Sequence, residues 1–309
     1  MKNTIAQVPL FPKLGDRPYL FQITGNRGGV RAYQLPGSSE PYWSVTGVLG
    51  NTISKPALQG WYNKQAREAV TDTLTFYVGK ILPANILDDS IEQAKKRPYR
   101  TSRESADVGT RAHDLFHRHI VMARQRRTAP GAYKIQASEI PSDLHIVYES
   151  FLEFEKSHIS KWLASEFAVY SSFFGYAGSV DALAMDNEGR YMVIDFKTGS
   201  RLYPENALQV AAYANALSIP LAEATNDNLE WDTWDMLKPY VVRLDKTVVK
   251  VEARQVTNPQ LALDGFLHAL GLWISLGYPG IGKKAKEEIE EHFSTHPNKK
   301  HKTSINKYF

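Results

Sequence analysis

Cysteine is absent from this chain, and its absence excludes several kinds of site. Disulfides, zinc sites with thiolate ligands and iron–sulfur clusters all need cysteine sulfur. The chain also lacks an apolar run of the ~20 residues that a membrane-spanning helix requires. Its first segment contains Lys2, Lys13, Asp16 and Arg17 and no continuous apolar stretch, so we expect no secretory signal. The default expectation is a cytoplasmic protein, with a phage or organellar origin left open.

The composition allows a folded core and a negatively charged partner. The 309 residues are enough for one large domain or two small ones, and a hydrophobic content of 43% supports a packed interior. The formal net charge of +4 is mildly basic and compatible with a polyanion, although many proteins without a nucleic-acid role are similar. Composition therefore limits the class of protein without selecting a function.

A predicted β-hairpin at residues 178–197 is the most informative stretch. Residues 178–186 and 190–197 are predicted as strands, the second rich in Val, Ile, Tyr and Phe, and the Asp-Asn-Glu-Gly sequence at 186–189 predicts a turn. With a loop at 187–189, antiparallel pairing places Asp181 opposite Asp195, with Cβ atoms roughly 4.5–5.5 Å apart.

Lys197 is expected on the same face as Asp195, because strand side chains alternate between faces. Two close carboxylates repel each other, and a divalent cation such as Mg²⁺ or Mn²⁺ relieves this repulsion. Such a metal lowers the pKa of a bound water and polarises a phosphoryl oxygen. Lys197 could orient the attacking water or stabilise charge on the phosphate. The alternative is an exposed hairpin with an ordinary surface ion pair.

A helix is predicted upstream, at residues 102–125, with Thr101 and Glu104 as a capping box. Gly109 and His113 are four residues apart and share one face of this helix. A mid-helix glycine costs ~1 kcal/mol relative to alanine, which makes sense where another element or a nucleic-acid backbone approaches closely. By itself, His113 would be interpreted as a structural histidine.

Four motifs together resemble a known family. They are Gly109-x-x-x-His113, Gly178-x-x-Asp181, Asp195-Phe196-Lys197 and Gln209-x-x-x-Tyr213. This order resembles the RecB-like branch of the PD-(D/E)XK nuclease superfamily. Within that branch, Trp43–Leu49 is similar to a segment of the mitochondrial genome-maintenance exonucleases and their phage relatives. Val180 stands where the superfamily's name has proline, which the branch often lacks, and the four-cysteine cluster of some RecB-like proteins is absent.

The resemblance implies an α/β fold, a restriction-endonuclease-like core with a mixed β-sheet flanked by helices, plus N- and C-terminal additions. It also implies that His113, Asp181, Asp195 and the Phe196 carbonyl hold Mg²⁺ or Mn²⁺, and that Lys197 assists the attacking water.

Three further residues are candidates for supporting roles. By analogy with the family, Gln209 orients Lys197 or the nucleic acid, and Tyr213 supports Gln209. Tyr213 could instead be a core aromatic. Glu166 is similar to a glutamate that precedes the Gly-x-x-Asp strand, and we expect it to position a ligand or water, or else to be a plain surface carboxylate.

The C-terminal region contains a Gly-rich turn. Residues 277–284 nearly match a phosphate-binding Walker A loop, but Lys284 replaces the required Ser or Thr and a helix precedes it, so we expect no nucleotide triphosphate. The turn is similar to the hairpin of a helix-hairpin-helix motif, in which Gly280, Gly282 and Lys283 would grip a phosphate. An ordinary interhelix turn is the alternative.

Four aromatic residues and one basic run are open to two interpretations. Trp61, Tyr62, Phe76 and Tyr77 could stack on unpaired bases or pack in a core. The basic run at 95–100 is most simply a solvated face. Further elements are predicted as strands at 19–24 and 30–35, helices at 44–80, 142–163, 204–217 and 259–276, a strand beginning at Glu166 and a hairpin at 238–254.

We predict three regions: an N-terminal extended and helical region at 1–100, the nuclease core at 101–256 and a C-terminal helical region at 257–309. The predicted function is metal-dependent DNA hydrolysis, as an exonuclease on single-stranded ends. The alternatives are a site-specific or structure-specific endonuclease and a catalytically silent DNA-binding module. DNA is the expected partner, together with replication or recombination proteins.

Overall fold

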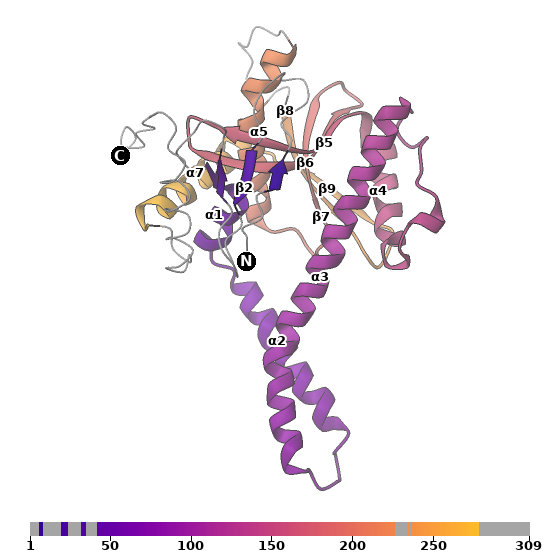
Figure 1. Ribbon diagram of the computed structural model, residues 1–309, viewed down its shortest axis with the longest axis vertical. Helices are drawn as coiled ribbons and strands as arrows, with labels where there is room; N and C mark the ends of the chain where they lie inside the picture. Colours follow the sequence, from indigo (N-terminus) through magenta and orange to yellow (C-terminus); the bar gives the residue numbers. More distant parts are fainter. Residues whose placement is uncertain are drawn as a thin grey trace. The chain divides into compact units, whose positions relative to one another are not determined.

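Figure 1 shows the computed structural model of the protein. The structure describes residues 6–8, 20–23, 32–34, 42–225, 234 and 237–277. The chain divides into two compact units, one formed by Ser54–Ala112 and the other by Met1–Ile53 with His113–Phe309. These boundaries differ from those of the three predicted regions. The predicted phosphate-gripping turn with Gly280, Gly282 and Lys283 lies outside the described residues.

The larger unit is built on a mixed sheet. Its described strands are β1 (Ala6–Val8), β2 (Leu20–Ile23), β3 (Ala32–Gln34), β4 (Tyr42–Ser44), β5 (Ile159–Ser171), β6 (Tyr176–Asp186), β7 (Tyr191–Lys197), β8 (Leu237–Leu244) and β9 (Val251–Gln255). They follow the order β1-β2-β3-β4-β6-β7-β8-β9, and β5 pairs with β6. The β4–β6 and β7–β8 pairs are parallel and the others antiparallel, which confirms the predicted mixed sheet.

Helices cover this sheet, as the restriction-endonuclease-like fold requires (Figure 1). In the larger unit the described helices are α1 (Val45–Thr52), α4 (His145–His158), α5 (Pro204–Thr225) and α7 (Pro259–Ser275), with short 3-10 turns at Ala137–Glu139 and Ser142–Leu144. Helix α5 packs against β5, β6, β7 and β8 and is itself covered by α7, while α4 contacts β5, β8 and β9. Ser44 caps α1, because its hydroxyl accepts a hydrogen bond from Gly47 N at 3.4 Å.

The smaller unit is a helical hairpin formed by α2 (Pro56–Thr75) and the first part of α3 (Ala84–Arg126). Pro56 opens α2, since proline suits the first helical turn. The two helices are linked by Arg97, whose guanidinium lies 2.5 Å from Asp72 and 3.7 Å from Glu68. Across the described residues of both units, no helix has the length and apolar character needed to cross a membrane.

Among the predicted boundaries, two in α3 and α4 were wrong. The capping box at Thr101 starts no helix, because α3 runs without a break through Pro98 and Thr101. Good helix formers on both sides, together with pairs such as Arg100–Glu104, outweigh the local capping signal. The helix predicted to end at residue 163 ends at His158. Pairing with β6 takes Ile159 and its successors into a strand, so tertiary contacts override local propensity.

Candidate active site

The hairpin that carries the two aspartates has the predicted loop. Asp186 N donates to Arg190 O at 2.9 Å, which leaves residues 187–189 as a three-residue loop. Gly189 has φ +81°, the left-handed conformation that closes such loops and that glycine adopts without strain. The last β6–β7 pair is Ala182 with Ile194, and the next position in this register places Asp181 opposite Asp195.

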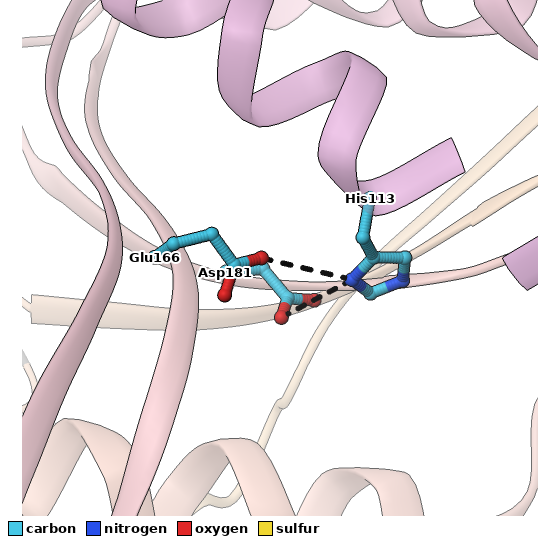
Figure 2. Close-up of side chains that lie close together, drawn as sticks. All are labelled: His113, Glu166 and Asp181. Atoms are coloured by element: carbon cyan, nitrogen blue, oxygen red, sulfur yellow. Dashed lines mark ion pairs between the residues drawn. The ribbon is translucent and has the colours of Figure 1, made fainter. Parts of the chain in front are cut away.

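Beside this hairpin, three side chains from three elements form a compact cluster (Figure 2). His113 comes from α3, Glu166 from β5 and Asp181 from β6. Each offers one ligand atom, and these atoms lie within 4.8 Å of one another. His113 Nδ1 is 3.4 Å from Asp181 Oδ1 and 3.9 Å from Glu166 Oε1. An imidazole and two carboxylates at this spacing are a suitable ligand set for a divalent cation.

Glu166 enters the cluster through an unusual backbone conformation. The sequence predicted that Glu166 begins a strand, but it lies in the middle of β5, with φ +48°. Its neighbours Ser165 and Phe167 pair with Ala182 and Val180, which puts Glu166 level with Asp181. A left-handed conformation for a non-glycine residue costs ~1–3 kcal/mol and is concentrated at functional sites.

A second group of side chains surrounds Asp195. Lys197 Nζ lies 2.6 Å from Asp195 Oδ2, and Gln209 Nε2 donates to Asp195 Oδ1 at 2.7 Å. Gln209 also receives a hydrogen bond from Lys197 Nζ at 3.4 Å and donates to Tyr213 Oη at 3.2 Å. Gln209 thus bridges the ammonium and the carboxylate, and the Tyr213 hydroxyl fixes the amide.

Gly178 supports this second group from β6. A Cβ atom at Gly178 would lie 2.3 Å from Cε1 of Tyr213, far inside a normal contact distance. The absence of a side chain at Gly178 therefore lets the Tyr213 ring pack on the strand backbone. The sequence motif included Gly178 without assigning it a role, because its neighbour in space is 35 residues away in the chain.

The charges of the two groups are coupled. Burial raises the pKa of Glu166 to about 8, and the nearby charge of Asp181 adds to this shift. Burial also raises the pKa of Asp195 to about 6, although the Lys197 ammonium opposes the rise. For Asp181, burial is outweighed by His113, Lys197 and a hydrogen bond from Phe196 N, so its pKa is lowered. The site therefore concentrates carboxylates whose full ionisation needs a positive partner.

The His113 side chain supplies positive charge beside these carboxylates. Burial acts to lower the pKa of His113, but the Asp181 and Glu166 carboxylates outweigh it and raise the value to about 9. A metal bound at this position would have to displace the proton from the imidazole, since only the neutral ring ligates.

The buried Asp195 Oδ2 atom faces the Lys197 ammonium, which lies 2.6 Å away. Phe196 N donates to Asp181 Oδ2 at 2.6 Å, so the backbone between Asp195 and Lys197 is tied to the cluster. A buried carboxylate that is neutralised by a cation is chemically suited to a site for a second, divalent cation.

The predicted metal-ligand side chains fall into two groups in the structure. His113 and Asp181 meet, and they are joined by Glu166, which the sequence had assigned only a positioning role. Among the described residues, Asp195 is not part of the 4.8 Å cluster, and its carboxylate is held by Lys197 and Gln209. Gly109 lies one helical turn before His113 on α3 but belongs to the smaller unit.

Ser179 is a residue of this region that sequence reasoning missed. Its hydroxyl lies 3.5 Å from Glu166 Oε2, as a hydrogen-bond donor. Its position next to Gly178 in the Gly-x-x-Asp motif was the only available signal, because the contact depends on the pairing of β5 with β6.

Comparison with known proteins agrees with this geometry. Residues 87–274 match the PD-(D/E)XK nuclease superfamily. The match covers more than half of the chain, so the protein belongs to this superfamily, whose members are nucleases that use divalent metal ions. A search of curated proteins gave no match.

Proposed function

We propose that the protein is a Mg²⁺- or Mn²⁺-dependent deoxyribonuclease of the RecB-like branch, acting as an exonuclease on single-stranded DNA ends. The observation that carries this proposal is the cluster of His113, Glu166 and Asp181 beside the Asp195–Lys197 ion pair. Ligands for a hard cation and a buried ammonium thus lie on one hairpin and its neighbours, which is the arrangement that phosphodiester hydrolysis needs.

The metal would be held by His113, Asp181, Asp195 and the Phe196 carbonyl, with Glu166 as a fifth ligand or as the group that positions a water. When bound, the cation supplies a water of lowered pKa and polarises a phosphoryl oxygen. The strained backbone at Glu166 is consistent with a role that requires its carboxylate to stay beside Asp181.

Lys197 acts on the attacking water or on the developing negative charge of the phosphate. An ammonium has three donor hydrogens, and contacts to Asp195 and Gln209 involve two of them, so one remains for the water or substrate. Gln209 and Tyr213 are positioning residues, since Gln209 holds both partners of the ion pair and Tyr213 holds Gln209.

Two nucleic-acid contacts and the choice of ends rest on the sequence motifs. Gly109 would allow close approach of a DNA backbone, and Gly280, Gly282 and Lys283 would grip a phosphate. Action on single-stranded ends rests on the similarity to the mitochondrial genome-maintenance exonucleases and phage relatives. Replication or recombination proteins are the partners that this activity suggests.

A nuclease assay tests the proposal. Single-stranded DNA labelled at either end, its duplex and a single-stranded circle are incubated with Mg²⁺, Mn²⁺ or EDTA. We expect stepwise shortening of the linear strand with metal, no cleavage of the circle and no reaction in EDTA. Lys197→Ala and Asp195→Ala should lose cleavage but retain most DNA binding, because binding depends on dispersed phosphate contacts.

Each alternative predicts a different result. Cleaved circles would identify an endonuclease, and discrete fragments from a closed circle would identify a site-specific one. DNA binding without cleavage in any metal would identify a silent binding module. Wild-type turnover by Asp195→Ala would refute the site assignment while leaving the superfamily membership intact.

A further inference from the structure

The helical hairpin of the smaller unit carries a surface that the catalytic site does not use. Residues 95–103 contain five cations and no carboxylate. Lys95 and Lys96 lie one turn before Tyr99 on α3, and Arg103 lies one turn after it, so the four side chains share one helix face. We refer to Lys95, Lys96, Tyr99 and Arg103 as the Tyr99 stripe.

Tyr99 is an exposed aromatic ring with a fixed support. Its relative exposure is 68%. The Tyr62 ring from α2 packs against it in an edge-to-face arrangement, with centroids 5.5 Å apart and an interplanar angle of 63°. Tyr62 is in turn held by Trp61 at 5.3 Å. This backing orders the Tyr99 ring before any ligand arrives, so stacking on it costs little further side-chain entropy.

The cations of the stripe are available to a polyanion. The side chains of Lys95 and Lys96 are 66% and 69% exposed, and both pair with the same half-exposed carboxylate of Glu92. Such surface ion pairs are weak and are readily exchanged for phosphate contacts.

We propose that the Tyr99 stripe binds single-stranded nucleic acid, with one unpaired base stacked on Tyr99 and the flanking phosphates on Lys95, Lys96 and Arg103. Charge complementarity selects a polyanion, and the exposed ring selects unpaired bases, because paired bases in a duplex offer no free face. The choice of DNA as the strand rests on the nuclease function proposed above. The site is sequence-independent, since every base has a face on which an aromatic ring can stack.

The hairpin provides its own matched controls. Phe76 is also 68% exposed, and its ring lies 3.9 Å from Lys80 Nζ, outside the stripe. Lys64 is 71% exposed and pairs with Glu68 on α2, outside the stripe. Phe76→Ala and Lys64→Gln therefore remove equivalent groups from the same unit without touching the stripe.

The test is equilibrium binding of fluorescein-labelled oligothymidylate to the full-length protein in EDTA, measured by fluorescence anisotropy. Tyr99→Ala should weaken binding about 5- to 150-fold, the range expected for loss of one stacked base, while Tyr99→Phe should stay within about twofold of wild type. Arg103→Gln should lower the slope of log K against log salt by about 0.7. Phe76→Ala and Lys64→Gln should leave Kd nearly unchanged.

The proposal is overturned if wild type binds no oligothymidylate, or if Tyr99→Ala binds as well as wild type. It is also overturned if Phe76→Ala weakens binding as much as Tyr99→Ala. If duplex of the same sequence competes equally and only Arg103→Gln has an effect, the stripe is a duplex contact. Thermal melting of each variant, followed by circular dichroism, verifies folding. Because EDTA prevents cleavage, failure of the nuclease assay leaves this result interpretable.

Discussion

The contact between Gly178 and Tyr213 allows a sharp prediction. In Gly178→Ala, the added methyl group would lie 2.3 Å from Cε1, 3.1 Å from Cζ and 3.2 Å from Cδ1 of Tyr213. Carbon atoms pack at ~3.5–4.0 Å, so the ring must move by more than ~1 Å or the strand must shift. Tyr213 is only 3% exposed, and neither partner has free space to give.

The substitution should reduce both stability and turnover. Overpacking of a buried contact costs ~1–3 kcal/mol in the free energy of unfolding. The movement of Tyr213 should displace Gln209, which holds Asp195 and Lys197, and a 1 Å misplacement of catalytic groups can cost about 100-fold in rate. We expect kcat to fall while KM changes little, because the phosphate contacts are dispersed.

Urea denaturation and a single-strand cleavage assay measure the two effects. Gly60→Ala is the control, since a Cβ there would meet nothing within 4 Å. It should be neutral or stabilising by up to ~1 kcal/mol, because alanine is the better helix former. In the double variant Gly178→Ala/Tyr213→Leu the clash is relieved, so the two substitutions should couple by about 0.5–3 kcal/mol. Wild-type stability of Gly178→Ala, or strict additivity in the double variant, would refute the reasoning.

Two further predictions concern the metal site and the buried polar network around Glu155 of α4. Mg²⁺ at 100 times its Kd should stabilise the fold by about 2.7 kcal/mol, and Asp181→Asn should abolish this gain in a thermal melt; an unchanged response would remove Asp181 from the ligand set. Glu155 is 1% exposed and accepts hydrogen bonds from Trp162 Nε1 at 2.6 Å and Gly131 N at 2.9 Å, with His119 Nε2 at 3.1 Å. Burial acts to raise the pKa of Glu155, but these contacts outweigh burial and lower the pKa. The stability that ionised Glu155 contributes is therefore fully present above its unfolded pKa of about 4.3. This stability is lost as the pH falls through the folded pKa. Glu155→Gln should therefore cost about 1–3 kcal/mol in urea melts at neutral pH, with a smaller deficit in acid, and a pH-independent deficit would contradict this account.

The sequence determined the hairpin and most of the elements around it, because their signals are local. Turn residues at 187–189 set the loop length, and loop length sets the β6–β7 register, so Asp181 opposite Asp195 could be predicted from the chain alone. The starts of α1 and α5 were predicted for the same reason, since caps and first-turn prolines act within a few residues. The superfamily could also be inferred, because its motifs have a fixed order along the chain.

Tertiary structure alone decided how these residues are grouped. Glu166 joins His113 and Asp181 because the pairing of β5 with β6 places it level with Asp181. Asp195 is directed to Lys197 and Gln209 because α5 packs across β7, and Gly178 acquires its role only when Tyr213 lies against it. These outcomes depend on contacts between segments far apart in the chain, and the sum of many such packing interactions is not contained in any local pattern.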